Sequence, residues 1–176
     1  AVKAAWRAFN REEKLDHHGE FYDMTLLPPD WAPRRHRHAM KVDISAVGPM
    51  MTRVAAQVAD GVHVHPLHSM VYLENRLLPD LAAGAAEVGR DPGEVDLFVP
   101  VFACPGDTPE ERADYVATAR RQIAFYGSTP NDACQFDDLG FEGTTGRIRA
   151  KFKAGELDTI GDVITDEMLE HYAVVA

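Results

Sequence analysis

The spacing of apolar residues changes several times along the chain, and each spacing predicts a kind of element. Apolar positions three or four residues apart share one face of a helix, whereas short continuous apolar runs are typical of buried parallel strands. Helices are therefore predicted over residues 2–9, 50–59, 71–88 and 108–126, and in two or three pieces over 131–171. Strands are predicted over residues 42–47, 62–65, 95–103 and 172–175.

The same pattern predicts which faces are buried. Two helices have inward-facing positions at helical spacing, namely Met51, Val54, Ala55 and Val58 in the first and Leu73, Leu77, Leu81 and Ala85 in the second. The run VDLFVPVFA over 95–103 is apolar on both faces, which predicts a strand buried between two layers.

Breakers and caps mark where elements begin and end. Thr108 followed by Pro109 is a typical N-cap and first position of a helix. Three prolines exclude a helix from residues 19–40, which we interpret as a long connection with one short extended piece at residues 20–22. The basic run over 34–38 is interpreted as a solvated loop.

Strands alternate with helices through most of the chain, and this order requires a parallel sheet with right-handed crossovers. Both a doubly wound sheet and a barrel satisfy it. We expect one domain over residues 1–176, in which 1–40 hold a helix end and a connection and 41–176 hold the strand–helix units. In either architecture ligands bind at the carboxyl ends of strands, which nominates residues 46–50, 65–69 and 104–107.

The composition narrows the range of partners and surroundings. A formal charge of −10 and a pI near 5.2 disfavour nucleic acid and anionic membranes, which need a positive field, so we expect a small-molecule substrate. No apolar run approaches the roughly 18 residues of a membrane span. Cys104 and Cys134 are too few for a disulfide framework, which favours the reducing cytoplasm as the location.

The first nominated strand end carries Gly48 and Pro49. Gly48 permits close approach to the backbone, and a helix that starts at Pro49 offers free N–H groups and the positive end of its dipole, so a phosphate fits there. The alternative is that Gly-Pro only marks a helix start. Neither a GxGxxG nor a GxxxxGK[ST] motif is present to decide between them. Residues 126–130 present a similar choice between a pocket wall and a helix end.

The second strand end holds three histidines, His63, His65 and His68. Residues two apart on a strand share a face, so these side chains allow a metal site of the kind that barrel hydrolases use. No acidic ligand is well placed on a neighbouring strand end, and a second interpretation makes His65, His68 and Ser69 hydrogen-bond donors to an anion or a cofactor ring. A third treats the histidines as the polar filling of a strand end. No nucleophile motif such as GxSxG accompanies Ser69 or Ser128.

Four stretches together resemble a known family: ISAVGPMMTRVAAQVADGVHVHPLHS, YLENRLLPDLAAGAAEVGRDPGEVDLFVPVFA, RRQIAFYGSTP and ITDEMLEHYAVVA. They resemble the C-terminal part of the bacterial luciferase-like monooxygenase superfamily, and more narrowly its actinobacterial branch of coenzyme F420-dependent oxidoreductases. The resemblance covers nearly the whole chain, although residues 131–153 match less well. Its most specific parts are the Gly-Pro turn, Ala-Asp-Gly and His-Pro-Leu-His-Ser.

The resemblance implies a TIM (β/α)8 barrel with a cofactor across the carboxyl ends of its strands. The hydride chemistry would belong to that cofactor, coenzyme F420 or alternatively FMN. The backbone at one strand end and the loop after the next strand would hold its phosphate and side chain. Carried onto this chain, the cofactor-binding residues are Ala46, Val47, Gly48, Met50, His65, Leu67, His68 and Ser69.

By this resemblance the chain represents roughly the C-terminal half of the barrel, with strands five to eight over residues 42–175. The residues that face the reactive ring would lie in strands one to four, so the sequence assigns no catalytic residue. We expect the exposed strand edges of such a half-barrel to favour a homodimer. Two further hypotheses stay open, a metal-dependent hydrolase that uses His63, His65 and His68, and a non-catalytic half-barrel fragment.

Overall fold

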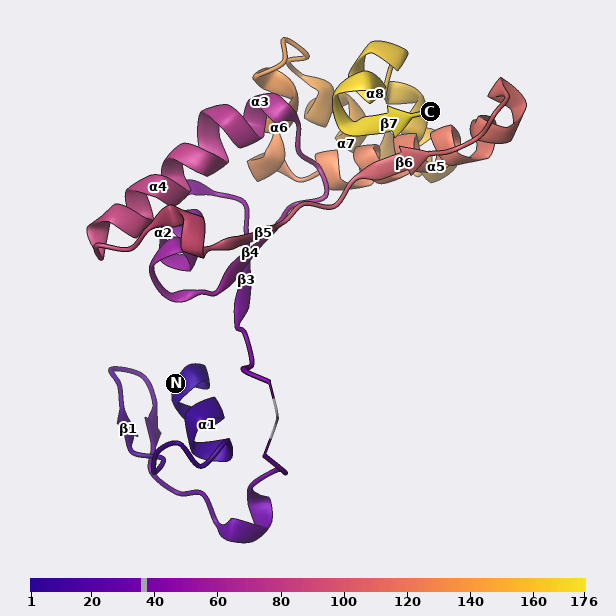
Figure 1. Ribbon diagram of the computed structural model, residues 1–176. Helices are drawn as coiled ribbons and strands as arrows, with labels where there is room; N and C mark the ends of the chain where they lie inside the picture. The colour runs from indigo at the N-terminus through magenta and orange to yellow at the C-terminus, as the bar shows by residue number, and fades with distance from the viewer. Residues whose placement is uncertain (36–37) are drawn as a thin grey trace.

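The N-terminal part of the chain forms a small unit of its own, ahead of the sheet and helices of the rest (Figure 1). The computed structural model describes residues 1–35 and 38–176, so His36 and Arg37 of the predicted basic loop lie outside the described residues. The unit contains helix α1 (Val2–Phe9), the two-stranded antiparallel hairpin β1 (His17–His18) and β2 (Asp23–Met24), and a 3-10 turn (Pro29–Trp31). The predicted helix over 2–9 is thereby confirmed.

The hairpin corrects one expectation for the long connection. Residues 20–22, predicted as an extended piece, form the turn between β1 and β2, where the Gly19 N–H donates to the Tyr22 carbonyl oxygen at 3.0 Å. The unit meets the sheet through Lys3, whose Nζ lies 2.7 Å from the Asp60 carboxylate.

The central sheet is parallel, as the alternation of strands and helices predicted. It contains β3 (Asp43–Ala46), β4 (Gly61–Val64) and β5 (Asp96–Phe98) in the order β3-β4-β5. A second parallel pair joins β6 (Phe102–Cys104) to β7 (Ala173–Val175). The single strand predicted over 95–103 is therefore two strands, separated by the segment around Pro100, whose nitrogen has no hydrogen to donate to a sheet.

Two helices cover one face of the central sheet. Helix α2 (Pro49–Val58) follows β3, and the helix predicted over 71–88 is a continuous rod of three parts: α3 (Met70–Tyr72), a π-helical segment (Leu73–Leu77) and α4 (Leu78–Glu87). On this rod the predicted inward residues Leu77, Leu81 and Ala85 are buried and Leu73 is half-buried.

The predicted buried face of α2 is right for Ala55 and wrong for its larger residues. Met51, Val54 and Val58 are exposed, and the face that packs consists of smaller residues, namely Thr52, Ala55, Ala56 and Ala59. The reason is the close approach of α4: a Cβ atom added to Gly84 would lie 2.5 Å from the Arg53 Cα atom. Two helices this near to each other leave room only for small side chains between them.

The C-terminal third is a cluster of helices on the β6-β7 side (Figure 1). Helix α5 (Pro109–Gly127) begins at the predicted N-cap Thr108 with a complete capping box. After it come a 3-10 turn (Pro130–Asp132), α6 (Cys134–Asp137), α7 (Thr144–Ala154), a second 3-10 segment (Leu157–Val163) and α8 (Asp166–Tyr172). Their shared core is formed by fully buried side chains, among them Ile123, Phe136, Ile148 and Ile164.

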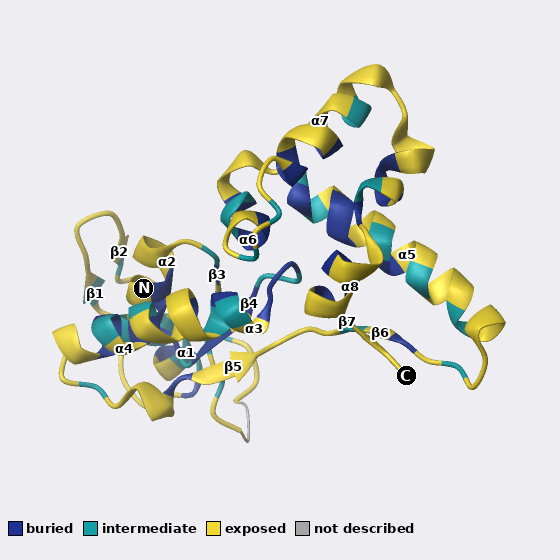
Figure 2. Ribbon diagram, turned by 90° about the horizontal axis from the view of Figure 1, so that it is seen from above, coloured by how far each residue is buried: buried dark blue, intermediate teal, exposed yellow. Residues whose placement is uncertain are grey.

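The sheet does not close on itself within the described residues, and its edge strand β5 is open to solvent. Leu97 and Phe98 on β5 are 38% and 42% exposed, and Val101 is 60% exposed, so the predicted full burial of 95–103 is wrong for this chain. Figure 2 shows β5 as an exposed strand at the sheet edge. Among the described helices, none is both long enough and apolar enough to cross a membrane.

Candidate functional site

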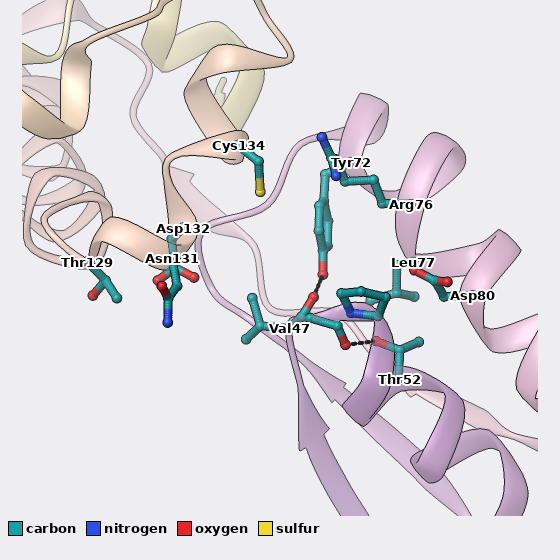
Figure 3. Close-up of a pocket in the computed structure, with 12 residues that line it drawn as sticks. Val47, Thr52, Tyr72, Arg76, Leu77, Asp80, Thr129, Asn131, Asp132 and Cys134 are labelled. Atoms are coloured by element: carbon teal, nitrogen blue, oxygen red, sulfur yellow. Dashed lines mark hydrogen bonds between the residues drawn. The ribbon is translucent and has the colours of Figure 1, made fainter.

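A cavity of about 600 Å³ opens at the carboxyl end of β3 (Figure 3). Three parts of the chain form its walls: the β3–α2 turn, the helical rod after β4, and the segment between α5 and α6. The lining residues are Val47, Gly48, Pro49, Thr52, Tyr72, Arg76, Leu77, Asp80, Thr129, Asn131, Asp132 and Cys134. The cavity therefore lies at the first strand end that the topology nominated.

The Gly48–Pro49 turn presents an open helix N-terminus to this cavity. Gly48 is the N-cap of α2, and a Cβ atom added to it would meet no atom within 4 Å. The N–H groups of Met50 and Met51 lie in the first turn, where no carbonyl four residues earlier belongs to the helix. Free N–H groups, the helix dipole and empty space above the turn suit a phosphate group.

Tyr72 joins the β3–α2 turn to the loop after β4. Its side chain is buried, its hydroxyl donates to the Val47 carbonyl oxygen at 2.5 Å, and its backbone N–H donates to the Ser69 Oγ atom at 3.1 Å. Burial, with Cys134 and Asp132 nearby, raises the pKa of the Tyr72 phenol to about 12. The hydroxyl therefore keeps its proton at neutral pH and remains a donor.

The histidine-containing loop folds back on itself beside the cavity. One ring nitrogen of His68 lies 2.8 Å from the His65 carbonyl oxygen, and one of His65 lies 3.2 Å from the Leu67 carbonyl oxygen. Leu67 is fully buried and belongs to the core of the C-terminal helices, while Ser69 caps α3. None of these four residues is among the described residues that line the cavity.

The eight residues predicted to bind a cofactor thus have different surroundings. Val47 and Gly48 line the cavity, Ala46 is buried below them in the core of the α2 side, and the Met50 side chain is 77% exposed. The loop residues lie behind the cavity wall, where Ser69 accepts from the backbone N–H of the lining residue Tyr72 and His65 lies near the lining residue Asp132. Their roles in cofactor binding stay predictions.

The histidine triplet does not form a metal cage. The His63 ring stacks on Phe98 with ring centroids 4.6 Å apart, and its Nε2 lies 3.6 Å from an Asp43 carboxylate oxygen. His65 instead packs edge-on against Tyr126. In residues 1–35 and 38–176, no group of three or more His, Cys, Asp or Glu side chains is arranged to hold a metal ion.

Sequence reasoning missed the charged wall of the cavity. Arg76 forms a two-pronged ion pair with Asp138, and Arg53 pairs with Asp80 at 3.0 Å. Asp132 is 7% exposed; burial raises the pKa of its carboxyl group, and the nearby His65 acts in the opposite direction. Only Thr129 belongs to the stretch over 126–130 for which the sequence offered a pocket wall as one interpretation.

Comparison with known proteins gives this geometry a family. A model of the family described as luciferase-like monooxygenase matches residues 1–176. The uncharacterized protein Rv1360 of Mycobacterium tuberculosis H37Rv is 35% identical over 176 residues, which are 99% of this chain and 52% of that protein. The 5,10-methylenetetrahydromethanopterin reductase of Methanolobus tindarius is 29% identical over 134 residues, which are 74% of this chain and 39% of the reductase.

A solved structure shares the fold. The coenzyme F420 dependent tetrahydromethanopterin reductase from Methanopyrus kandleri aligns with a TM-score of 0.76 at 16% sequence identity, over 98% of this chain and 48% of the reductase chain. The chain spans about half the length of the relatives that it matches. The prediction of a luciferase-like barrel, represented here by about half of it, is confirmed.

Proposed function

Because the chain belongs to the luciferase-like monooxygenase family, we propose that it serves a flavin- or deazaflavin-dependent oxidoreductase and holds the phosphate end of the cofactor. The preferred cofactor is coenzyme F420, with FMN as the alternative, and the substrate is a small organic molecule. Similarity to a methylenetetrahydromethanopterin reductase supports this preference, since the matching solved reductase is described as coenzyme F420 dependent.

The observation that carries the proposal is the open Gly48–Pro49 turn above the cavity. Two first-turn N–H groups of α2, at Met50 and Met51, are free to donate to phosphate oxygens, and the space above Gly48 is empty. Val47 would contribute its apolar side chain to the cavity wall. The bound cofactor supplies hydride transfer, and these residues supply position and a local field.

Cofactor titration tests this proposal. The complete gene product that contains this chain is titrated with coenzyme F420 and with FMN, and we expect a micromolar or tighter dissociation constant for at least one of them. Absence of binding by both refutes the proposal. Riboflavin, which has the ring and ribityl chain of FMN but no phosphate, serves as the control ligand and should bind more weakly.

A pair of substitutions at one position isolates the turn. Gly48→Ala adds a methyl group into empty space at a φ of −87°, which any residue adopts, so fold and affinity should be preserved. Gly48→Glu places a carboxylate where the phosphate is expected and should weaken FMN or coenzyme F420 binding at least about tenfold, since like charges repel strongly in a partly enclosed site. Equal affinities of the two variants contradict the assigned position of the phosphate.

The proposal also includes a homodimer and a cytoplasmic location. The exposed apolar residues of β5 support the homodimer, and sedimentation equilibrium of the complete gene product tests it. A cytoplasmic location is supported by the free cysteines Cys104 and Cys134. The competing hypothesis of a metal-dependent hydrolase has no three-residue cluster in the described part of the chain to support it. The hypothesis of a non-catalytic fragment predicts no activity, and measurable turnover by the 176 residues alone would refute it.

A further inference from the structure

The carbonyl oxygens of two consecutive residues in the β3–α2 turn are each held by a side-chain hydroxyl (Figure 3). The Val47 oxygen accepts from the Tyr72 hydroxyl at 2.5 Å, and the Gly48 oxygen accepts from the Thr52 Oγ1 atom at 3.1 Å. Both donors are buried, with exposed fractions of 2% and 1%. The two contacts fix the orientation of successive peptide planes, because each plane turns as a rigid unit.

The two hydroxyls have different origins. Thr52 belongs to the first turn of α2, so its contact with Gly48 is local to that helix. Tyr72 belongs to the helical rod after the next strand, 25 residues further along the chain, and its own N–H is held by Ser69 at the end of the histidine-containing loop. Only the Tyr72 contact ties the turn to another strand–helix unit.

We propose that Tyr72 is a positioning residue for the phosphate end of the cofactor: its hydroxyl sets the Val47–Gly48 peptide so that the first-turn N–H groups of α2 point into the cavity. This inference rests on the proposed function for the identity of the ligand. It also gives Ser69 a role different from ligand contact, because Ser69 holds the backbone from which the tyrosine side chain extends.

The surroundings keep the hydroxyl in its donor form and the ring in place. Val64 and Leu77 pack against the ring in a small apolar cluster, and burial raises the pKa of the phenol to about 12, so it stays protonated at neutral pH. The ring contributes packing and the hydroxyl contributes a hydrogen bond. Substitution by Phe keeps the ring and removes only the hydrogen bond.

A matched control exists elsewhere in the chain. Tyr172 is 6% exposed and donates its hydroxyl to the Gln135 carbonyl oxygen at 2.6 Å, within the C-terminal helical core. Tyr72→Phe and Tyr172→Phe therefore each remove one hydroxyl-to-carbonyl hydrogen bond of similar length, part-buried for Tyr72 and buried for Tyr172. Their effects on folding should be similar, whereas only the first removes a contact of the turn.

The experiment measures FMN, coenzyme F420 and riboflavin affinities of the complete gene product and its two variants, beside their urea midpoints. We expect Tyr72→Phe to weaken binding of the phosphate-bearing ligands by about twofold to tenfold, as loss of one hydrogen bond predicts, with a smaller effect on riboflavin. Tyr172→Phe should leave all three affinities unchanged. Equal affinities of the two variants for FMN and coenzyme F420 overturn the inference.

Amide hydrogen exchange separates this inference from the proposed function. Tyr72→Phe should speed exchange at residues 47–52 relative to Tyr172→Phe, because the turn loses its outside contact. If the unsubstituted protein binds neither cofactor, the proposed function fails, while faster exchange in that segment still supports Tyr72 as the residue that fixes the turn. Unchanged exchange there refutes the positioning role regardless of cofactor binding.

Discussion

Replacement of Gly84 by alanine tests the contact between α2 and α4. The added Cβ atom would lie 2.5 Å from the Cα atom and from the carbonyl oxygen of Arg53. These are backbone atoms, so no side chain can rotate away and the two helices must separate. Overpacking of this kind costs about 1–3 kcal/mol, whereas the gain from replacing a helical glycine by alanine is only about 1 kcal/mol.

Gly146→Ala supplies the control for this prediction. Gly146 also lies in a helix, α7, but a Cβ atom added there meets no atom within 4 Å. Both variants gain helix propensity, so the difference between their unfolding free energies isolates the packing cost. We expect Gly84→Ala to be less stable than Gly146→Ala by about 1–3 kcal/mol, or roughly 2–12 °C in the unfolding midpoint at about 2–4 °C per kcal/mol.

Urea unfolding followed by far-ultraviolet circular dichroism is the suitable assay. Both tryptophans, Trp6 and Trp31, lie in the N-terminal unit, so their fluorescence would report poorly on the α2–α4 contact. Equal stability of the two alanine variants would refute the reasoning, since it would mean that the helices separate without cost.

Three further predictions concern the cap of α5 and the charged wall of the cavity. Thr108→Ala should destabilise the protein by about 1 kcal/mol in urea unfolding, because the capping box with Glu111 is lost, whereas Thr108→Ser should keep most of it. The hydrogen bond from Arg76 lowers the pKa of Asp138, so this pair stabilises the fold above the ordinary carboxyl pKa of about 3.9 and loses its effect as the pH falls through the lowered pKa. Because the pair is partly exposed, Asp138→Asn should cost at most about 1 kcal/mol near pH 6, and urea midpoints should show this cost shrinking as the solution is acidified. Burial raises the pKa of Asp132, so its carboxyl group contributes to stability below about pH 3.9, and this contribution is lost as the pH rises through the raised pKa. Asp132→Asn should therefore become more stable relative to the unsubstituted protein from acid to neutral pH. A difference in urea midpoint that does not change with pH would contradict this.

Local signals in the sequence predicted the elements that surround the site. Pro49 placed the start of α2, and the Thr108 cap placed the start of α5, because the physics of a helix end involves only neighbouring residues. Alternation of strands and helices predicted the parallel sheet. Together these signals predicted that Gly48 lies where a strand end meets the N-terminus of a helix.

Features that depend on distant partners were not predictable in this way. The buried face of α2 is set by the absence of a side chain at Gly84, so apolar spacing at Met51 and Val54 was misleading. The hydrogen bond from Tyr72 to Val47 joins residues 25 positions apart. It depends on how the helical rod, with its π-helical segment, is oriented on the sheet. The predicted burial of 95–103 failed because strand composition does not show what covers the strand.

The sheet is interrupted around Pro100, and the two largest groups of buried residues in the described chain form separate cores. One core joins β3, β4, α2 and α4, and another joins the helices from α5 to α8, with Leu67 as the buried residue that the β4–α3 loop adds to the second. Each region can open with its own free energy, as native-state exchange reveals in other proteins. The cavity has walls from both, so a ligand bound there would link their opening equilibria. Ligand binding should then be visible as added protection from exchange in α5 and α6 as well as in the β3–α2 turn.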